Sequence, residues 1–189
     1  MKKIFLFPIL YVLIVYSIVV TLNIPYINYL LMILFLLCCI FNIYIGIRYC
    51  NSEHRDNLLK CAIIIKYLLI PFYLFGALLI VISFAFIIIP HLSFMVIGAF
   101  VFTIIGWIIL IFGNPYLISY AVILYREKKI NIAILIIHIV SSFFFCFDVI
   151  NTMWFSIINN VLRKITIFVI SILVILFAII TFRIIFFLI

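Results

Sequence analysis

The sequence predicts an all-α fold, a polytopic membrane helix bundle of about six transmembrane helices with both termini in the cytoplasm. The first observation is composition: hydrophobic residues make up 72% of the 189 residues and charged residues only 8%, whereas a soluble domain is about half apolar and a quarter charged. The second is a mean hydropathy of +1.64. The third is that the apolar residues come in runs of about 20, the length that crosses a bilayer. We expect one integral membrane domain over 1–189, with spans at about 4–22, 27–47, 66–89, 92–112, 131–150 and 165–187.

The first two spans contain few polar residues. The first begins after Lys2 and Lys3 and ends at a turn near Pro25. It is too long for the apolar region of a signal peptide and lacks a small-residue cleavage site, so we expect it to be retained. The second span carries Asn42 and Gly46 one turn apart, which predicts that a neighbouring helix approaches closely and shares a hydrogen bond. The alternative for Asn42 is a contact to a substrate.

The segment 48–60 is the most polar stretch of the chain and predicts a solvated loop. It contains Cys50, Glu53 and His54, residue types that bind zinc. Their spacing is not diagnostic, and a hydrated loop of mixed charge is the simpler interpretation, so we expect no metal and no cofactor. Lys66 lies just inside the next apolar run, and we expect its amine to extend to the membrane interface.

The fourth span follows a short uncharged connection at Pro90 and His91. Small residues recur along it at helical spacing, which predicts a seam where helix backbones pack closely and makes it the expected central helix. These helix-packing positions are Ala99, Thr103, Gly106 and Gly113.

A helix break is predicted at 113–115, where the sequence reads Gly-Asn-Pro. An unbroken helix from Leu92 to Tyr125 would be about 51 Å long, well beyond the bilayer core. Two alternatives remain for 116–125, because it either lies at the interface or continues the fourth helix. At the interface, its wetter face would carry Tyr116, Ser119 and Tyr120.

The segment 131–152 carries a polar stripe on an otherwise apolar helix, which predicts that the stripe faces neighbouring helices. The stripe consists of Asn131, His138, Ser141, Ser142, Asp148 and Thr152. Ten helical residues separate His138 from Asp148 by about 15 Å, so the two side chains cannot touch. We expect Asp148 to pair with Arg163 or Lys164 near the outer face, and His138 to be neutral and bonded to a neighbouring helix.

The basic residues predict the orientation. With six spans and a cytoplasmic N-terminus, ten of the 12 lysines and arginines fall inside and only Arg163 and Lys164 outside, in agreement with the positive-inside rule. The inside set is Lys2, Lys3, Arg48, Arg55, Lys60, Lys66, Arg126, Lys128, Lys129 and Arg183. This distribution accounts for the net charge of +8 without a nucleic-acid partner.

In length, in its MKK start and in the segments GNPYLISYAVILYREKK and HIVSSFFFCFDVI, the chain resembles uncharacterised small multi-pass membrane proteins of low-GC Gram-positive bacteria. The resemblance implies a bacterial cytoplasmic (cell) membrane location. It implies no role for any residue.

Three functions remain open. The first is a non-enzymatic accessory protein or subunit of a membrane complex, whose partners are the lipid bilayer and other membrane subunits or a second copy of the chain. The second is a small-solute or ion transporter that uses the polar positions Asn42, His138, Ser141, Ser142 and Asp148. The third is a lipid-modifying enzyme, which is disfavoured because no catalytic cluster can be assembled from the sequence. The sequence also lacks HExxH, GxSxG and phosphate-loop motifs, which weakens metalloprotease, serine-nucleophile and nucleotide-driven roles.

Overall fold

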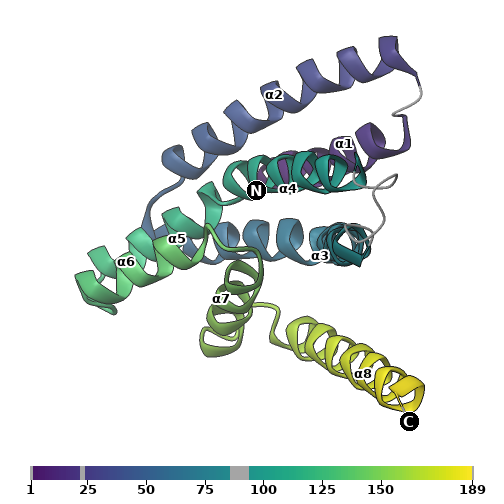
Figure 1. Ribbon diagram of the computed structural model, residues 1–189. Helices are drawn as coiled ribbons and strands as arrows, with labels where there is room; N and C mark the ends of the chain where they lie inside the picture. The colour runs from purple at the N-terminus through teal and green to yellow at the C-terminus, as the bar shows by residue number, and fades with distance from the viewer. Residues whose placement is uncertain (1, 22–23, 86–93, 189) are drawn as a thin grey trace.

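The computed structural model describes residues 2–21, 24–85 and 94–188, which include no strand, and the all-α prediction is confirmed. Four helices of these residues, α2, α3, α4 and α8, are long and apolar enough to cross a membrane (Figure 1). The elements are η1 Lys2–Phe5, α1 Leu6–Val20, α2 Pro25–Arg48, η2 Ser52–His54, α3 Arg55–Ala85, α4 Phe94–Gly113, α5 Pro115–Arg126, α6 Ile132–Ser141, α7 Phe145–Ile158 and α8 Arg163–Leu188. The connection expected at Pro90 and His91 lies outside the described residues.

Prolines and asparagines set several helix boundaries. Pro25 and Pro115 stand at the start of α2 and α5, where the missing amide hydrogen costs nothing. Asn131 caps α6, because its side-chain oxygen accepts a hydrogen bond of 2.8 Å from the amide three residues later. Since α4 ends at Gly113 and α5 begins two residues on, the predicted helix break is confirmed.

The central helix is α3, not α4 as the small-residue seam suggested. It packs against α1, α4, α5 and α7. It starts at Arg55, eleven residues before the predicted span, because 55–60 of the predicted loop is helical. Figure 1 shows α3 between α4 on one side and α7 on the other. By contrast, α4 exposes Ile104, Ile105 and Ile108, so only one of its faces is in the core.

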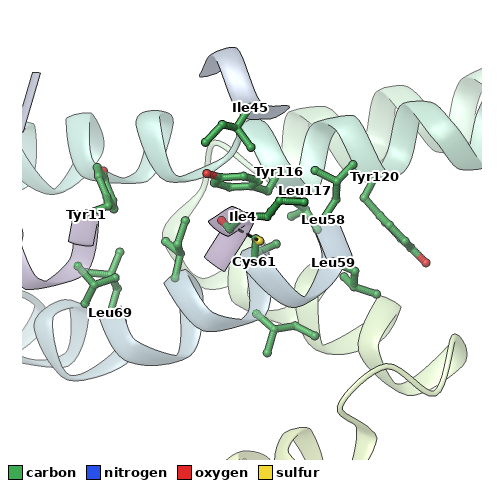
Figure 2. Packing of buried hydrophobic residues seen from close by; sticks show 14 of the residues in the cluster. Ile4, Tyr11, Ile45, Leu58, Leu59, Cys61, Leu69, Tyr116, Leu117 and Tyr120 are labelled. Atoms are coloured by element: carbon green, nitrogen blue, oxygen red, sulfur yellow. Dashed lines mark hydrogen bonds between the residues drawn. The ribbon is translucent and has the colours of Figure 1, made fainter. Parts of the chain in front are cut away.

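The helix α5 is buried, which contradicts the interfacial alternative for 116–125. Tyr116 and Tyr120 are fully buried, and Ser119 is nearly so. Figure 2 shows the ring of Tyr116 within the core that α2, α3 and α5 share. The hydroxyl of Tyr116 donates a hydrogen bond of 2.9 Å to Oδ1 of Asn42, which offsets the cost of burying it.

The predicted close approach at Asn42 and Gly46 is confirmed. A Cβ atom added to Gly46 would lie 3.1 Å from the Cβ of Pro115, which is tighter than most real contacts. The glycine therefore allows the start of α5 to lie against α2, where Tyr116 can bond to Asn42.

The predicted fifth span is instead a hairpin of two antiparallel helices, α6 and α7. Asn151 of α7 bonds to His138 of α6 through its Oδ1, 2.6 Å from the histidine Nδ1, and through its Nδ2, 3.2 Å from the histidine carbonyl oxygen. In one continuous helix these residues would be about 20 Å apart. The chain therefore reverses at 142–144, and the prediction of one continuous helix over 131–150 was wrong.

The helix α8 runs in the same direction as α3. Thr166 in its first turns accepts a hydrogen bond of 2.7 Å from the hydroxyl of Tyr67, and Leu173 further along lines a cavity with α3 residues from Ile70 to Ile80. Arg163 and Lys164, three and two residues before Thr166, therefore lie in the half of the bundle that contains the start of α3, not at the opposite end as predicted.

One end of the bundle consequently holds ten of the 12 basic residues, while Lys66 is interior and Arg183 lies near the other end. The ten are Lys2, Lys3, Arg48, Arg55, Lys60, Arg126, Lys128, Lys129, Arg163 and Lys164. We call this end the basic end. There the carboxylate of Glu127 lies 2.6 Å from Lys129 and 3.0 Å from Arg55. The bond to Lys129 is the main cause that lowers the pKa of Glu127 to about 2, so this link from α5 to α3 is ionised at neutral pH.

Candidate functional site

The centre of the bundle contains an ion pair between Lys66 of α3 and Asp148 of α7. The lysine Nζ lies 2.5 Å from Oδ2 of the aspartate, and both side chains are fully buried. The predicted partners of Asp148, Arg163 and Lys164, are exposed at the basic end, so that prediction was wrong. The expectation that Lys66 extends to the interface was also wrong, because its amine finds an opposite charge inside.

Asn114 connects the ion pair to two interruptions in the helices. It occupies the break between α4 and α5, and its side-chain oxygen accepts a hydrogen bond from Nζ of Lys66. Its side-chain nitrogen donates to the carbonyl oxygen of Ser142, in the turn between α6 and α7. One amide therefore joins a charged side chain to a backbone carbonyl that has no partner within its own helix.

Two polar groups near the ion pair have no hydrogen-bond partner among the described residues. One is Oδ1 of Asp148, and the other is the hydroxyl of Tyr73 on α3. Buried polar groups in proteins are nearly always paired, and the exceptions often belong to water, ion or functional sites. The carboxylate of Asp148 thus retains an oxygen that can accept a further ligand.

His138 belongs to a separate polar cluster. It bonds to Asn151, as expected for contact with a neighbouring helix, and its ring packs on Phe155 with centroids 4.4 Å apart. The hydroxyls of Ser141 and Ser142 donate back to the carbonyl oxygen of His138, at 3.0 and 2.7 Å. These contacts satisfy the carbonyl oxygen of His138 in the last turns of α6, so both serine hydroxyls bond locally to the backbone of α6.

The predicted positions are therefore only partly brought together. Asp148 and the carbonyl of Ser142 lie at the ion-pair site, whereas His138 lies in the hairpin and Asn42 lies between α2 and α5. Sequence reasoning missed Lys66 as a site residue. The signal for it was present, because charged residues inside apolar runs face the interior and pair with one another or with backbone carbonyls, and the chain has both a lysine and an aspartate in such runs.

The helix-packing positions on α4 have different environments. Gly106 lies against α7, since a Cβ there would be 3.2 Å from the ring of Phe145. Gly113 lies against α3, with Ile65 at 3.2 Å and Nζ of Lys66 at 3.7 Å. Thr103 donates to the carbonyl oxygen of Ala99 in its own helix. The two glycines therefore allow α7 and Lys66 to approach, and the other two positions are half-buried.

Within the described ranges, no group of three or more His, Cys, Asp or Glu side chains is placed to hold a metal ion. The zinc alternative at Cys50, Glu53 and His54 gains no support from the structure. His54 instead packs its ring edge-on against Tyr49, with centroids 4.9 Å apart.

The four long apolar helices indicate an all-helical membrane protein. The chain belongs to the family described as "Family of unknown function (DUF6652)", which matches residues 3–161. This match covers the elements from η1 to α7 and ends two residues before α8 begins at Arg163. No curated protein and no solved structure matches the chain.

Proposed function

We propose that the protein is a non-enzymatic subunit or accessory of a larger complex in the bacterial cytoplasmic membrane, and that α8 is its contact with the partner chain. The observation that carries this proposal is the isolation of α8. Among the residues of α8 whose burial is described, only Thr166 is buried, although the helix is 26 residues long. The interior polar residues support a structural role, because most of them bond to one another.

In this proposal the basic end faces the cytoplasm. The helices α1, α2, α3, α4 and α8 cross the membrane, so the chain makes five crossings and its termini lie on opposite sides. The hairpin of α6 and α7 enters and leaves on the cytoplasmic side. The positive-inside rule supports this arrangement, since ten basic residues lie at one end and Arg183 lies near the other. A re-entrant hairpin is tolerated at membrane depth where protein covers its turn, and Asn114 bonds to that turn.

Photo-cross-linking along α8 tests the subunit proposal. A photoreactive phenylalanine analogue is placed singly at Phe168, Phe177 and Phe182, which are 65%, 73% and 70% exposed, and at Tyr29 of α2 for comparison. Irradiation of cells should give discrete protein adducts from one face of α8. If every α8 position gives only lipid adducts and the purified protein is monomeric in mild detergent, the proposal fails.

A second candidate function is ion or small-solute transport, favoured by the unpartnered Oδ1 of Asp148 beside two helix interruptions. Transporters commonly bind substrates where helices are broken near the membrane interior. Reconstituted protein under an imposed pH gradient and membrane potential would then carry a flux that Asp148→Asn abolishes. Absence of flux, with a requirement for Asp148 in folding alone, would remove this candidate.

Variants of the ion pair distinguish the two candidate functions. Removing one partner of a buried pair costs about 3–5 kcal/mol, whereas replacing both by apolar residues is often neutral. If the pair is structural, Lys66→Met alone should lower the amount of folded protein, and Lys66→Met with Asp148→Val should restore both folding and the α8 adducts. For a transporter, the double variant would fold but carry no flux.

A further inference from the structure

The bundle contains an apolar cavity of about 460 Å³ between α3, α4, α7 and α8. Its walls include Ala77 of α3, Phe102 of α4, Val149 of α7 and Leu173 of α8. Polar atoms contribute almost none of the lining, and the hydroxyl of Thr103, one of the lining residues, bonds to its own helix. A polar solute would lose its hydration there without compensation, so the occupant must be apolar.

The position of the cavity follows from the hairpin. The helix α7 begins at the level of Gly106 and Tyr73, which Phe145 contacts, and then runs back toward the basic end, where Phe155 meets Tyr120. The first turns of α7 therefore close one end of the cavity. Further toward the other end of α3 and α4, the hairpin supplies no side chains to fill the space between these helices and α8.

The volume of the cavity favours a lipid occupant over a protein occupant. An α-helix with its side chains is about 10–12 Å wide and rises about 5.4 Å per turn, so a single turn takes up roughly 400–600 Å³. The cavity would hold about one turn, too little to seat a helix from a partner or a second copy. A hydrocarbon chain is as thin as one extended side chain and can enter from the surrounding bilayer.

We propose that this cavity holds one hydrocarbon tail of a membrane lipid, which completes the packing of the re-entrant hairpin. This inference rests on the membrane placement described under the proposed function. The tail would contact Phe145 and Val149, which lie on either side of Asp148 on α7. It would therefore stabilise the first turn of α7, which carries Asp148 of the ion pair. The bound tail thus acts as a structural part of the site.

A phospholipid with a photoreactive diazirine in its acyl chain tests the proposal in reconstituted vesicles, with the adducts mapped by mass spectrometry. We expect adducts on α7 and on α3 near Ala77 that saturate and are displaced by unlabelled phospholipid. Ala77→Phe should reduce them at least fivefold, whereas Leu37→Phe, a matched change on the exposed face of α2, should leave them unchanged. Labelling that does not saturate, or that Ala77→Phe leaves unchanged, overturns the proposal.

Cys146 provides a second measurement on the folded protein if Ala77→Phe does not fold. It lines the cavity and is exposed, whereas Cys38, Cys39 and Cys61 are buried and the half-buried Cys50 does not line the cavity. A long-chain alkyl thiosulfonate transfers its alkylthio group to Cys146 as a mixed disulfide and releases sulfinate. This modification should block the lipid adducts, and Cys146→Ser should prevent the block. Undiminished adducts after complete modification would contradict a single-tail site. Because the readout is a lipid adduct, its failure is distinct from a failure to find protein adducts on α8.

Discussion

Asn114 holds the ion-pair site together at the scale of single residues. It accepts a hydrogen bond from Lys66 and donates one to Ser142. Since a hydrogen bond to a charged group contributes about 1.5–3 kcal/mol, Asn114→Ala should lower the free energy of unfolding in detergent micelles by about 2–4 kcal/mol.

Asn57→Ala is the matched control for this change. Asn57 is half-buried on α3, and no side-chain hydrogen bond is described for it, so its replacement should stay within about 0.5 kcal/mol of the parent. Equal effects at Asn57 and Asn114 would mean that the amide does not connect the two helix interruptions.

Gly106 and Gly98 form a matched pair on α4. A Cβ atom at Gly106 meets Phe145 at 3.2 Å, whereas at Gly98 no atom lies within 4 Å. Gly106→Leu should therefore destabilise the fold by about 1–3 kcal/mol through overpacking, and Gly98→Leu should not. Thermal unfolding of both variants in one detergent measures the difference. Ile109, which apolarity alone suggests as a lipid-facing control, is unsuitable because it is only 4% exposed.

At the scale of helices, the predictable features are those encoded by local sequence. The start of α2 at Pro25, the break at 113–115 and the cap at Asn131 follow from residue types with fixed backbone preferences. The reversal at 142–144 has no such signal, because Ser-Phe-Phe contains neither glycine nor proline and the helical periodicity continues across it. Its cause is tertiary, since Asn151, Asn114 and the side chains of α3 hold the two halves in place.

The hairpin can be tested directly with a pair of cysteines. In a variant without the native cysteines, His138→Cys with Asn151→Cys should be joined by a short bifunctional thiol reagent, because these side chains bond in the hairpin. The cross-link is measured with a polyethylene-glycol maleimide, which modifies free thiols but not the two cross-linked cysteines. The pair Ser156→Cys with Thr166→Cys, which replaces another bonded pair, serves as the positive control. A single helix would separate 138 from 151 by about 20 Å and leave both thiols free.

At the scale of the whole molecule, the proposed membrane topology depends on the hairpin of α6 and α7. The apolar runs and the basic residues were recognisable in the sequence, but in the proposed arrangement 131–150 is not a crossing, which reverses the side assigned to α8. Counting it as a crossing placed Arg163 and Lys164 on the outer face and made them the expected partners of Asp148, whose partner in the structure is Lys66. With the hairpin re-entrant, both residues join the basic end, and Lys66 becomes the partner that a lone buried carboxylate requires.

Reporter fusions test this arrangement of the chain in the membrane. Alkaline phosphatase is active only after export and a green fluorescent protein fluoresces only inside, so a fusion after Ile189 should be active with the first and dark with the second. Fusions after Lys129, in the turn at the basic end, should give the opposite result, and Cys50 should react with an impermeant thiol reagent only once the cytoplasmic side is opened. These outcomes follow because the hairpin adds no crossing between Lys129 and α8. A fluorescent fusion after Ile189 would mean that α6 and α7 together cross the membrane, as the sequence alone suggested, and would remove the re-entrant arrangement.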